Sequence, residues 1–144
     1  MIRVRKSKDY AEAFITFGVA SEPCFHLLVP LTEARREQGL QKFPKPGPRE
    51  GMLFTSDNDW PNVGRVSMWL ASVSTALDMV WLDAGGHVLA VRPEIRPGDP
   101  RTFSYQALAC VEVAGGTCKR LGIKDGTPYA LHGGSCAQPL DLLL

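Results

Sequence analysis

Short runs of apolar residues, separated by glycine, proline and acidic turn residues, follow one another along most of this 144-residue chain. Each run is about four to eight residues long, which is typical of strands and too short for most helices. We therefore expect strands over these segments: 13–20, 24–31, 51–56, 65–70, 77–82, 87–95 and 106–113, with a last strand after 126. The first two runs are separated by the turn signal SEP, which predicts a hairpin.

Two segments have the end signals of short helices instead. In the sequence LTEARREQGL, Thr32 is a good N-cap, Glu33 suits the first turn, and Gly39 is a natural stop. The sequence GGTCKRLG predicts a second helix of one to two turns that ends at Gly122. The fold class that follows is α+β and β-dominated: an antiparallel barrel or sandwich of about 7–8 strands with two short helices.

The most apolar stretch, residues 65–88, has a carboxylate in its middle. With the two-residue period of a strand, Asp78 shares a face with Val80 and Leu82, opposite Met79 and Trp81. A carboxylate on such a face needs hydrogen-bond donors, or its pKa must rise. Asp78 is therefore the first candidate for a site residue.

Two interpretations of Asp78 stay open at this point. In the first, it is structural and accepts hydrogen bonds from backbone amides or a tryptophan, or pairs with Arg36 or Arg65. In the second, Asp78 forms an acid/base couple with Glu112, and Trp69 lines a pocket beside them. The first interpretation is the more common arrangement for a buried carboxylate.

Composition and charge narrow the class of protein. A chain of 144 residues with 44% apolar residues, 22% charged residues and a net charge of +1 is typical of one soluble domain. We divide it into a basic arm at 1–12, a β-rich core at 13–131 and a tail at 132–144.

The small net charge predicts no specific nucleic-acid partner, and no run approaches the ~20 apolar residues of a membrane span. No cleaved signal peptide is visible, which predicts a cytoplasmic or virion location with free thiols.

The residues that usually bind metals or act as nucleophiles are scattered. The four cysteines include no C-x-x-C pair, and the three histidines match no zinc pattern. Ser135 and Cys136 follow two glycines, but G-x-S-x-G is not formed. We therefore expect no metal and no cofactor, and a non-enzymatic function is favoured over an enzymatic one.

Four motifs in order give the chain a family resemblance: TEARREQGL, GMLF, WLASVSTALDMVWLD and VEVAGGTCKRLGIKDG. Over roughly residues 13–131 the chain resembles the domain of unknown function 192 family, whose members show T-x-E-E-R-x-x-G-L, G-M-L-F and W-M-K-N-T-x-x-P-L-D. The resemblance implies a compact β-rich fold and no established activity. This chain departs from the central motif, with Ala71, Ser72, Val73 and Ala76 in place of K-N-T-x-x-P.

Two functions of different classes remain. The first is a non-catalytic structural or interaction module whose partners are other protein chains, either copies of itself or a larger assembly. Trp60, between Asp59 and Pro61, would be its contact residue, unless it folds back over the core. Because family members also occur in bacteriophage genomes, an accessory or capsid-associated component of a phage particle is one version. The alternative is a small-molecule-binding or hydrolytic domain that uses Asp78 and Glu112.

Overall fold

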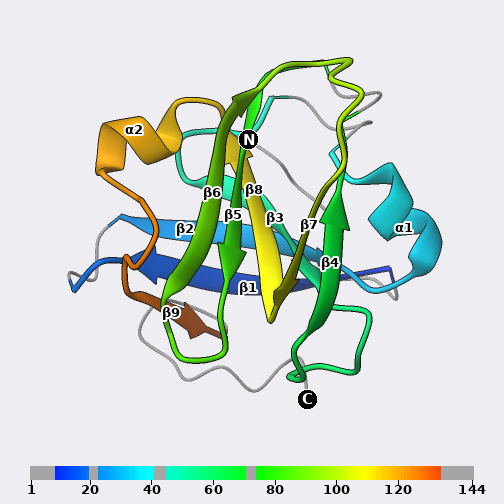
Figure 1. The fold of residues 1–144 in the computed structure, drawn as a ribbon, viewed down its shortest axis with the longest axis horizontal. Helices are drawn as coiled ribbons and strands as arrows, with labels where there is room; N and C mark the ends of the chain where they lie inside the picture. Colours follow the sequence, from blue (N-terminus) through cyan, green and yellow to red (C-terminus); the bar gives the residue numbers. More distant parts are fainter. Residues whose placement is uncertain (1–8, 20–22, 41–44, 71–73, 134–144) are drawn as a thin grey trace.

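The fold consists mainly of strands that build one large and one small sheet (Figure 1). A computed structural model describes residues 9–19, 23–40, 45–70 and 74–133. Within them the elements are β1 (Tyr10–Phe17), β2 (Cys24–Pro30), α1 (Glu33–Gln38), β3 (Glu50–Thr55), β4 (Gly64–Met68), β5 (Leu77–Leu82), β6 (Val88–Ile95), β7 (Phe103–Ala107), β8 (Ala109–Ala114), α2 (Thr117–Leu121) and β9 (Tyr129–His132). The predicted fold class is confirmed.

The large sheet has seven strands in the order β6-β5-β8-β3-β2-β1-β9, and the small sheet pairs β4 with β7. In Figure 1 the β1–β2 hairpin runs across the direction of β5, β6 and β8, so the large sheet curls strongly from one edge to the other. All its pairs are antiparallel except β2 with β3, which is parallel. A parallel pair needs a crossover connection, and here α1 lies within that connection.

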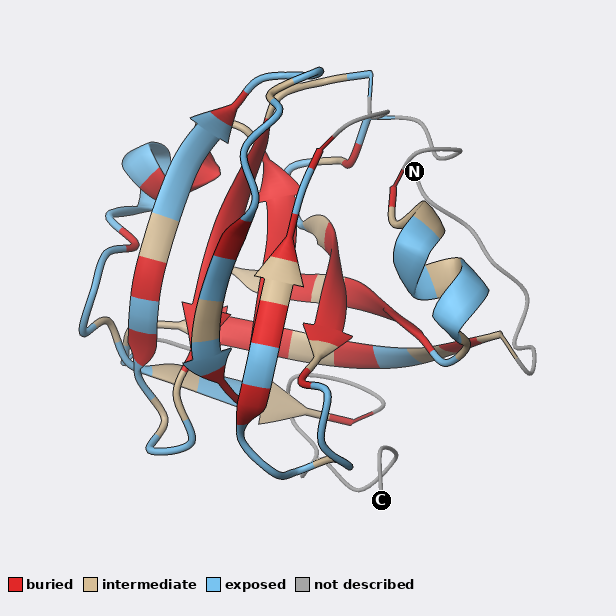
Figure 2. Ribbon diagram, turned by 45° about the vertical axis from the view of Figure 1, so that its right-hand side comes forward, coloured by how far each residue is buried: buried red, intermediate tan, exposed pale blue. Residues whose placement is uncertain are grey.

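Both faces of the central strands are buried, by two different clusters of side chains. The first core cluster joins the large sheet to β4 and β7, and it contains Met52, Phe54, Met68, Met79 and Trp81 among others. The second core cluster lies on the opposite face and includes Val80, Leu82, Val113 and Cys118 of α2. All six residues of β5 and all six of β8 are buried as a result (Figure 2). The predicted alternation along β5 is therefore observed.

Most local predictions agree with the structure, but the strand predicted at 106–113 does not. Thr32 caps α1 through its side chain, which accepts a hydrogen bond from the Arg35 N–H, and Gly39 ends the helix at φ 53°. The single strand predicted at 106–113 is instead divided at Leu108 between β7 of the small sheet and β8 of the large one. The Leu108 backbone bonds to Leu82 and to Ser56, so the chain changes sheets there without losing backbone hydrogen bonds.

The predicted arm and tail lie mostly outside the described residues, as do Ala71, Ser72 and Val73. Residues 10–12, assigned to the arm, belong to β1. The expectation of free thiols holds for Cys110 and Cys118 but is wrong for Cys24, which forms a disulfide. Among the described residues, no helix is long and apolar enough to cross a membrane.

Gly51 of β3 lies in close contact with the neighbouring strand β8 of the large sheet. A Cβ at this position would overlap the backbone carbonyl oxygen of Glu112 on β8 and lie 3.0 Å from Val113 Cγ1. We expect Gly51→Ala to lower the free energy of unfolding by about 2–3 kcal/mol, because the pairing of β3 with β8 must shift. Chemical denaturation measures this, with Gly85→Ala as the control, whose new Cβ would meet nothing closer than 3.5 Å. Equal stability of the two variants would contradict the described β3–β8 register.

Candidate functional site

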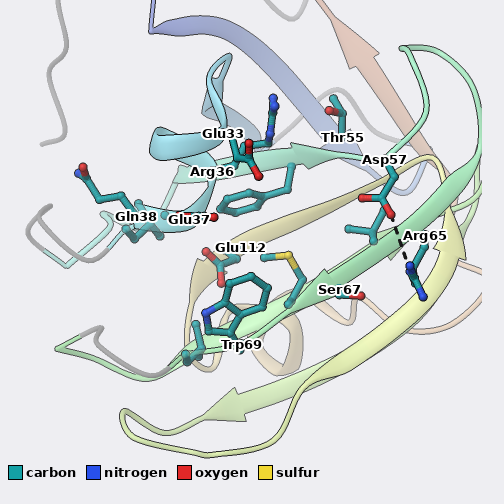
Figure 3. A pocket seen from close by; sticks show the side chains of 16 residues that line it. Glu33, Arg36, Glu37, Gln38, Thr55, Asp57, Arg65, Ser67, Trp69 and Glu112 are labelled. Atoms are coloured by element: carbon teal, nitrogen blue, oxygen red, sulfur yellow. Dashed lines mark ion pairs between the residues drawn. The ribbon is translucent and has the colours of Figure 1, made fainter.

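A pocket of about 280 Å³ lies between α1 and β4, on the same side of the large sheet as the first core cluster (Figure 3). Small-molecule sites usually have volumes of ~300–1,000 Å³, so this one lies just below that range. Its walls come from α1 and the two residues after it, from the end of β3, from β4 with the residues that follow, and from β8. Residues more than 70 positions apart in the sequence therefore meet here.

The pocket has an apolar floor and a large aromatic side chain at its rim. Leu40, Phe54, Met68 and Leu70 are all buried, so the floor is lined by hydrocarbon and sulfur atoms. Trp69 follows β4 and is 49% exposed, although it is one of the largest apolar side chains in the chain. In Figure 3 its indole ring lies next to the Glu112 carboxyl.

Glu112 is the one ionisable group at the bottom of this pocket, and only 2% of it is exposed. It lies on β8 directly between Met52 of β3 and Met79 of β5, both fully buried. Its carboxyl group makes no hydrogen bond and no ion pair with any other residue in the described ranges. Burial raises the pKa of Glu112 to about 8, so the carboxyl is mostly protonated at neutral pH.

The rim of the pocket is charged and exposed. Helix α1 contributes Glu33, Arg36 and Glu37, and the opposite side contributes Asp57 and Arg65. The last two form an ion pair of 3.7 Å and neutralise one another. Two acidic side chains and one basic one therefore remain on the helix side, with Glu112 below them.

Asp78 lies on the opposite face of the sheet and has a structural role. It is fully buried, and Oδ1 accepts hydrogen bonds from the backbone N–H of Glu94 (2.7 Å) and Gly116 (3.1 Å). Oδ2 accepts from the backbone N–H of Cys118 at 2.8 Å, in the first turn of α2. Asp78 therefore ties β6 and the start of α2 to the centre of the sheet, which is the backbone-amide interpretation that the sequence left open.

The predicted couple of Asp78 with Glu112 is wrong. In the β5–β8 register Asp78 is opposite Val113 while Glu112 is opposite Met79, so the two carboxylates point to opposite faces of one sheet. Neither proposed arginine partner reaches Asp78 among the described residues, since Arg36 lines the pocket on the other face and Arg65 pairs with Asp57. Both acids were correctly predicted to lie on strands, but the register of one strand against the other was not predicted.

The other candidates fall in two places. Arg36 and Trp69 line the pocket together with Glu112, so three of the five predicted site residues meet there. Trp60 is outside the pocket, half-buried against the second core cluster, which is the folded-back alternative. The floor residues Phe54 and Met68 were not predicted as site residues. The buried end of the GMLF motif and the period of residues 65–70 were their only signals in the sequence.

Comparisons with known proteins place this geometry in a family. Residues 17–130 match DUF192, whose description is "Uncharacterized ACR". The chain belongs to the DUF192 family. This confirms the resemblance carried by the four sequence motifs, over nearly the same residues. No curated protein sequence matches the chain.

Two solved structures share the fold of this DUF192 protein. One, from Sinorhizobium meliloti 1021, is described as a "putative transcription regulator"; it is 27% identical, with a TM-score of 0.68 over 85% of this chain and 95% of that one. The other is a protein of unknown function from Novosphingobium aromaticivorans DSM 12444, 23% identical, with a TM-score of 0.65 over 83% of this chain and 84% of that one. The described residues hold no group of three or more histidine, cysteine or acidic side chains able to bind a metal ion.

Proposed function

We propose that this protein is a non-catalytic small-molecule-binding domain whose ligand occupies the pocket between α1 and β4. The observation that supports this best is Glu112, a buried carboxyl with no partner among the described residues, at the bottom of an open apolar pocket. Burying a polar group without a hydrogen bond costs about 1–3 kcal/mol. A ligand that completes the hydrogen bonding of this carboxyl would offset that cost.

The residues that line the pocket favour ligand binding over catalysis. Catalysis by a hydroxyl, thiol or amine nucleophile needs that group within hydrogen-bond reach of a base. The two hydroxyl groups in the pocket belong to Thr55 and Ser67, and the Ser67 hydroxyl is hydrogen-bonded to Ser104 at 2.9 Å. General acid–base catalysis by two carboxyl groups of the sheet is not available either. Asp78 lies on the other face of the sheet from Glu112.

The Sinorhizobium neighbour's description as a "putative transcription regulator" names no ligand, so it neither supports nor opposes this proposal. We do not extend the proposal to DNA contact, since a net charge of +1 provides little of the phosphate neutralisation that such binding needs. The interaction-module hypothesis, with its phage version, stays a prediction. Trp60, its expected contact residue, is half-buried against the core and so offers less contact area than the sequence suggested.

A fragment screen by protein-observed NMR tests the proposed function. The probes are small amines, amides, alcohols, sugars and carboxylic acids, and we expect at least one class to shift the signals of β4, α1 and the Trp69 indole. A phenylalanine at Thr55, a half-buried wall residue, would fill part of the pocket. Thr55→Phe should therefore abolish these shifts, while Thr102→Phe, at an exposed position outside the pocket, should retain them. Shifts that survive Thr55→Phe, or a screen in which no class perturbs the pocket, would contradict the proposal.

A further inference from the structure

We propose that the ligand of this pocket is a small organic cation, whose charged nitrogen binds the ionised Glu112 carboxylate while its apolar part lies against Trp69 and the pocket floor. This inference rests on the proposed function and specifies the chemical class of the ligand. It follows from three properties of the pocket: a buried carboxyl without a partner among the described residues, an excess of acidic groups, and an exposed aromatic face.

The first property is that the Glu112 carboxyl makes no hydrogen bond with any of the described residues. The carboxyl lies among Met52, Met79 and Phe54, none of which donates a hydrogen bond, and the Gly39 backbone above it is close enough that a Cβ there would lie 3.9 Å from Oε1. A positively charged group entering from the open side is the partner that stabilises such a carboxylate most, since opposite charges attract strongly where water is excluded.

The second property is the sign of the remaining charge. The charged groups that face Glu112 from the surrounding elements are Glu33, Arg36 and Glu37 on α1, with Asp57 after β3 and Arg65 on β4. Asp57 and Arg65 cancel as an ion pair. The remaining groups are two rim carboxylates against one guanidinium, and an ionised Glu112 adds a third negative charge. An anionic ligand would be repelled, while a cationic one would be attracted.

The third property is the aromatic wall. The Trp69 indole is half exposed at the rim and lies beside the Glu112 carboxyl (Figure 3). Tryptophan is the aromatic ring over whose face cations bind most favourably. Phe54, Met68 and Leu70 supply the apolar surface that the hydrocarbon part of an organic cation would bury.

Cation binding in this pocket must release a proton. The unliganded carboxyl has a pKa of about 8 and is mainly neutral at pH 7, whereas the bound state requires the carboxylate. The proton leaves Glu112 for the buffer, and the ligand keeps its own charge. Affinity for a permanent cation should therefore rise about tenfold per pH unit below the pKa and level off above it.

Calorimetry with three probes of similar size tests this inference: benzyltrimethylammonium (a permanent cation), benzyl alcohol (neutral) and benzoate (an anion). Titrations at pH 6, 7 and 8, in two buffers of different ionisation heat, count the released protons. We expect the cation to bind at least about tenfold more tightly than either other probe and to release close to one proton at pH 7.

Three variants identify the group responsible. Glu112→Gln should weaken cation binding about tenfold or more at pH 8 and remove its pH dependence. The control Glu33→Gln, at an exposed rim acid, should retain both the pH dependence and the proton release. Arg36→Gln should bind the cation more tightly, because a repelling charge is removed.

The outcomes separate this inference from the proposed function. Equal binding of benzyl alcohol and the cation in the pocket, without proton release, would overturn the cation inference and leave a ligand-binding pocket. Tighter binding of benzoate, weakened by Arg36→Gln, would likewise overturn it in favour of an anion. Failure of all three probes to bind would also overturn it, and the fragment screen with Thr55→Phe would then decide the proposed function separately.

Discussion

Replacing Asp78 with alanine is expected to lower the free energy of unfolding by about 4 kcal/mol or more. The variant removes the acceptor of three backbone N–H groups, from Glu94, Gly116 and Cys118, at a fully buried position. Each buried donor left without a partner costs about 1–3 kcal/mol. Domains of this size are stable by about 5–15 kcal/mol in total, so a large part of the stability depends on this one carboxylate.

Urea denaturation followed by circular dichroism measures the effect, with Asp125→Ala as the matched control at an exposed aspartate. Asp78→Asn should lie between alanine and the wild type, because its amide oxygen still accepts the two N–H groups that face Oδ1, while its NH₂ group opposes the Cys118 N–H. If Asp78→Ala and Asp125→Ala unfold at the same denaturant concentration, Asp78 does not hold β6 and α2 in the way described.

The second large effect is a loss of stability as the pH rises. The folded-state pKa of Glu112 is about 8, above its ordinary value of 4.5. Folding therefore favours the protonated form, and its contribution is fully present below pH 4.5 and is lost progressively up to the folded-state pKa. The difference of 3.5 units corresponds to roughly 4–5 kcal/mol. The free energy of unfolding should fall by about 1.4 kcal/mol per pH unit across this window and then stop falling from this cause.

Denaturation at a series of pH values from 5 to 9 measures this slope, and two variants test its origin. Glu112→Gln should remove this component of the slope, because glutamine does not titrate. Glu112→Met should be more stable than the wild type at pH 9, since it replaces an unpaired buried charge with an apolar group of similar volume. The same slope in the wild type and Glu112→Gln would show that other groups cause the pH dependence.

Local sequence signals were sufficient to predict most helices and strands, because a cap or turn residue acts on the backbone next to it. Thr32 and Gly39 bound α1 as expected, and Leu77–Leu82 is a strand with the predicted alternation. The pairing of strands that are far apart in the sequence could not be predicted from such local signals. The chain crosses between sheets at Leu108 inside a continuous apolar run, where period and composition do not change. The parallel pairing of β2 with β3 likewise depends on how the intervening α1 connection folds back.

The candidate site could be predicted by residue type but not by arrangement. Glu112 and Trp69 were identified because an acid in an apolar strand and a tryptophan in a motif are unusual, and both line the pocket. Asp78 had the same sequence signature as Glu112 and yet has the opposite role. The distinction comes from the register of β5 against β8 and from the position of α2, which supplies N–H donors to one face only. Sequence period alone contains neither of these facts.

Glu112 is a buried carboxyl at the bottom of a pocket with no partner among the described residues, and its own titration tests this most directly. Carbon-detected NMR of protein labelled with ¹³C in the glutamate side chains follows each carboxyl with pH, and the Glu112→Gln variant assigns the signal. We predict a midpoint near 8 for Glu112, which moves downward when benzyltrimethylammonium is added. A midpoint near the ordinary value of 4.5 in the free protein would contradict the account, because it would mean that the carboxylate already has water or a partner to stabilise it.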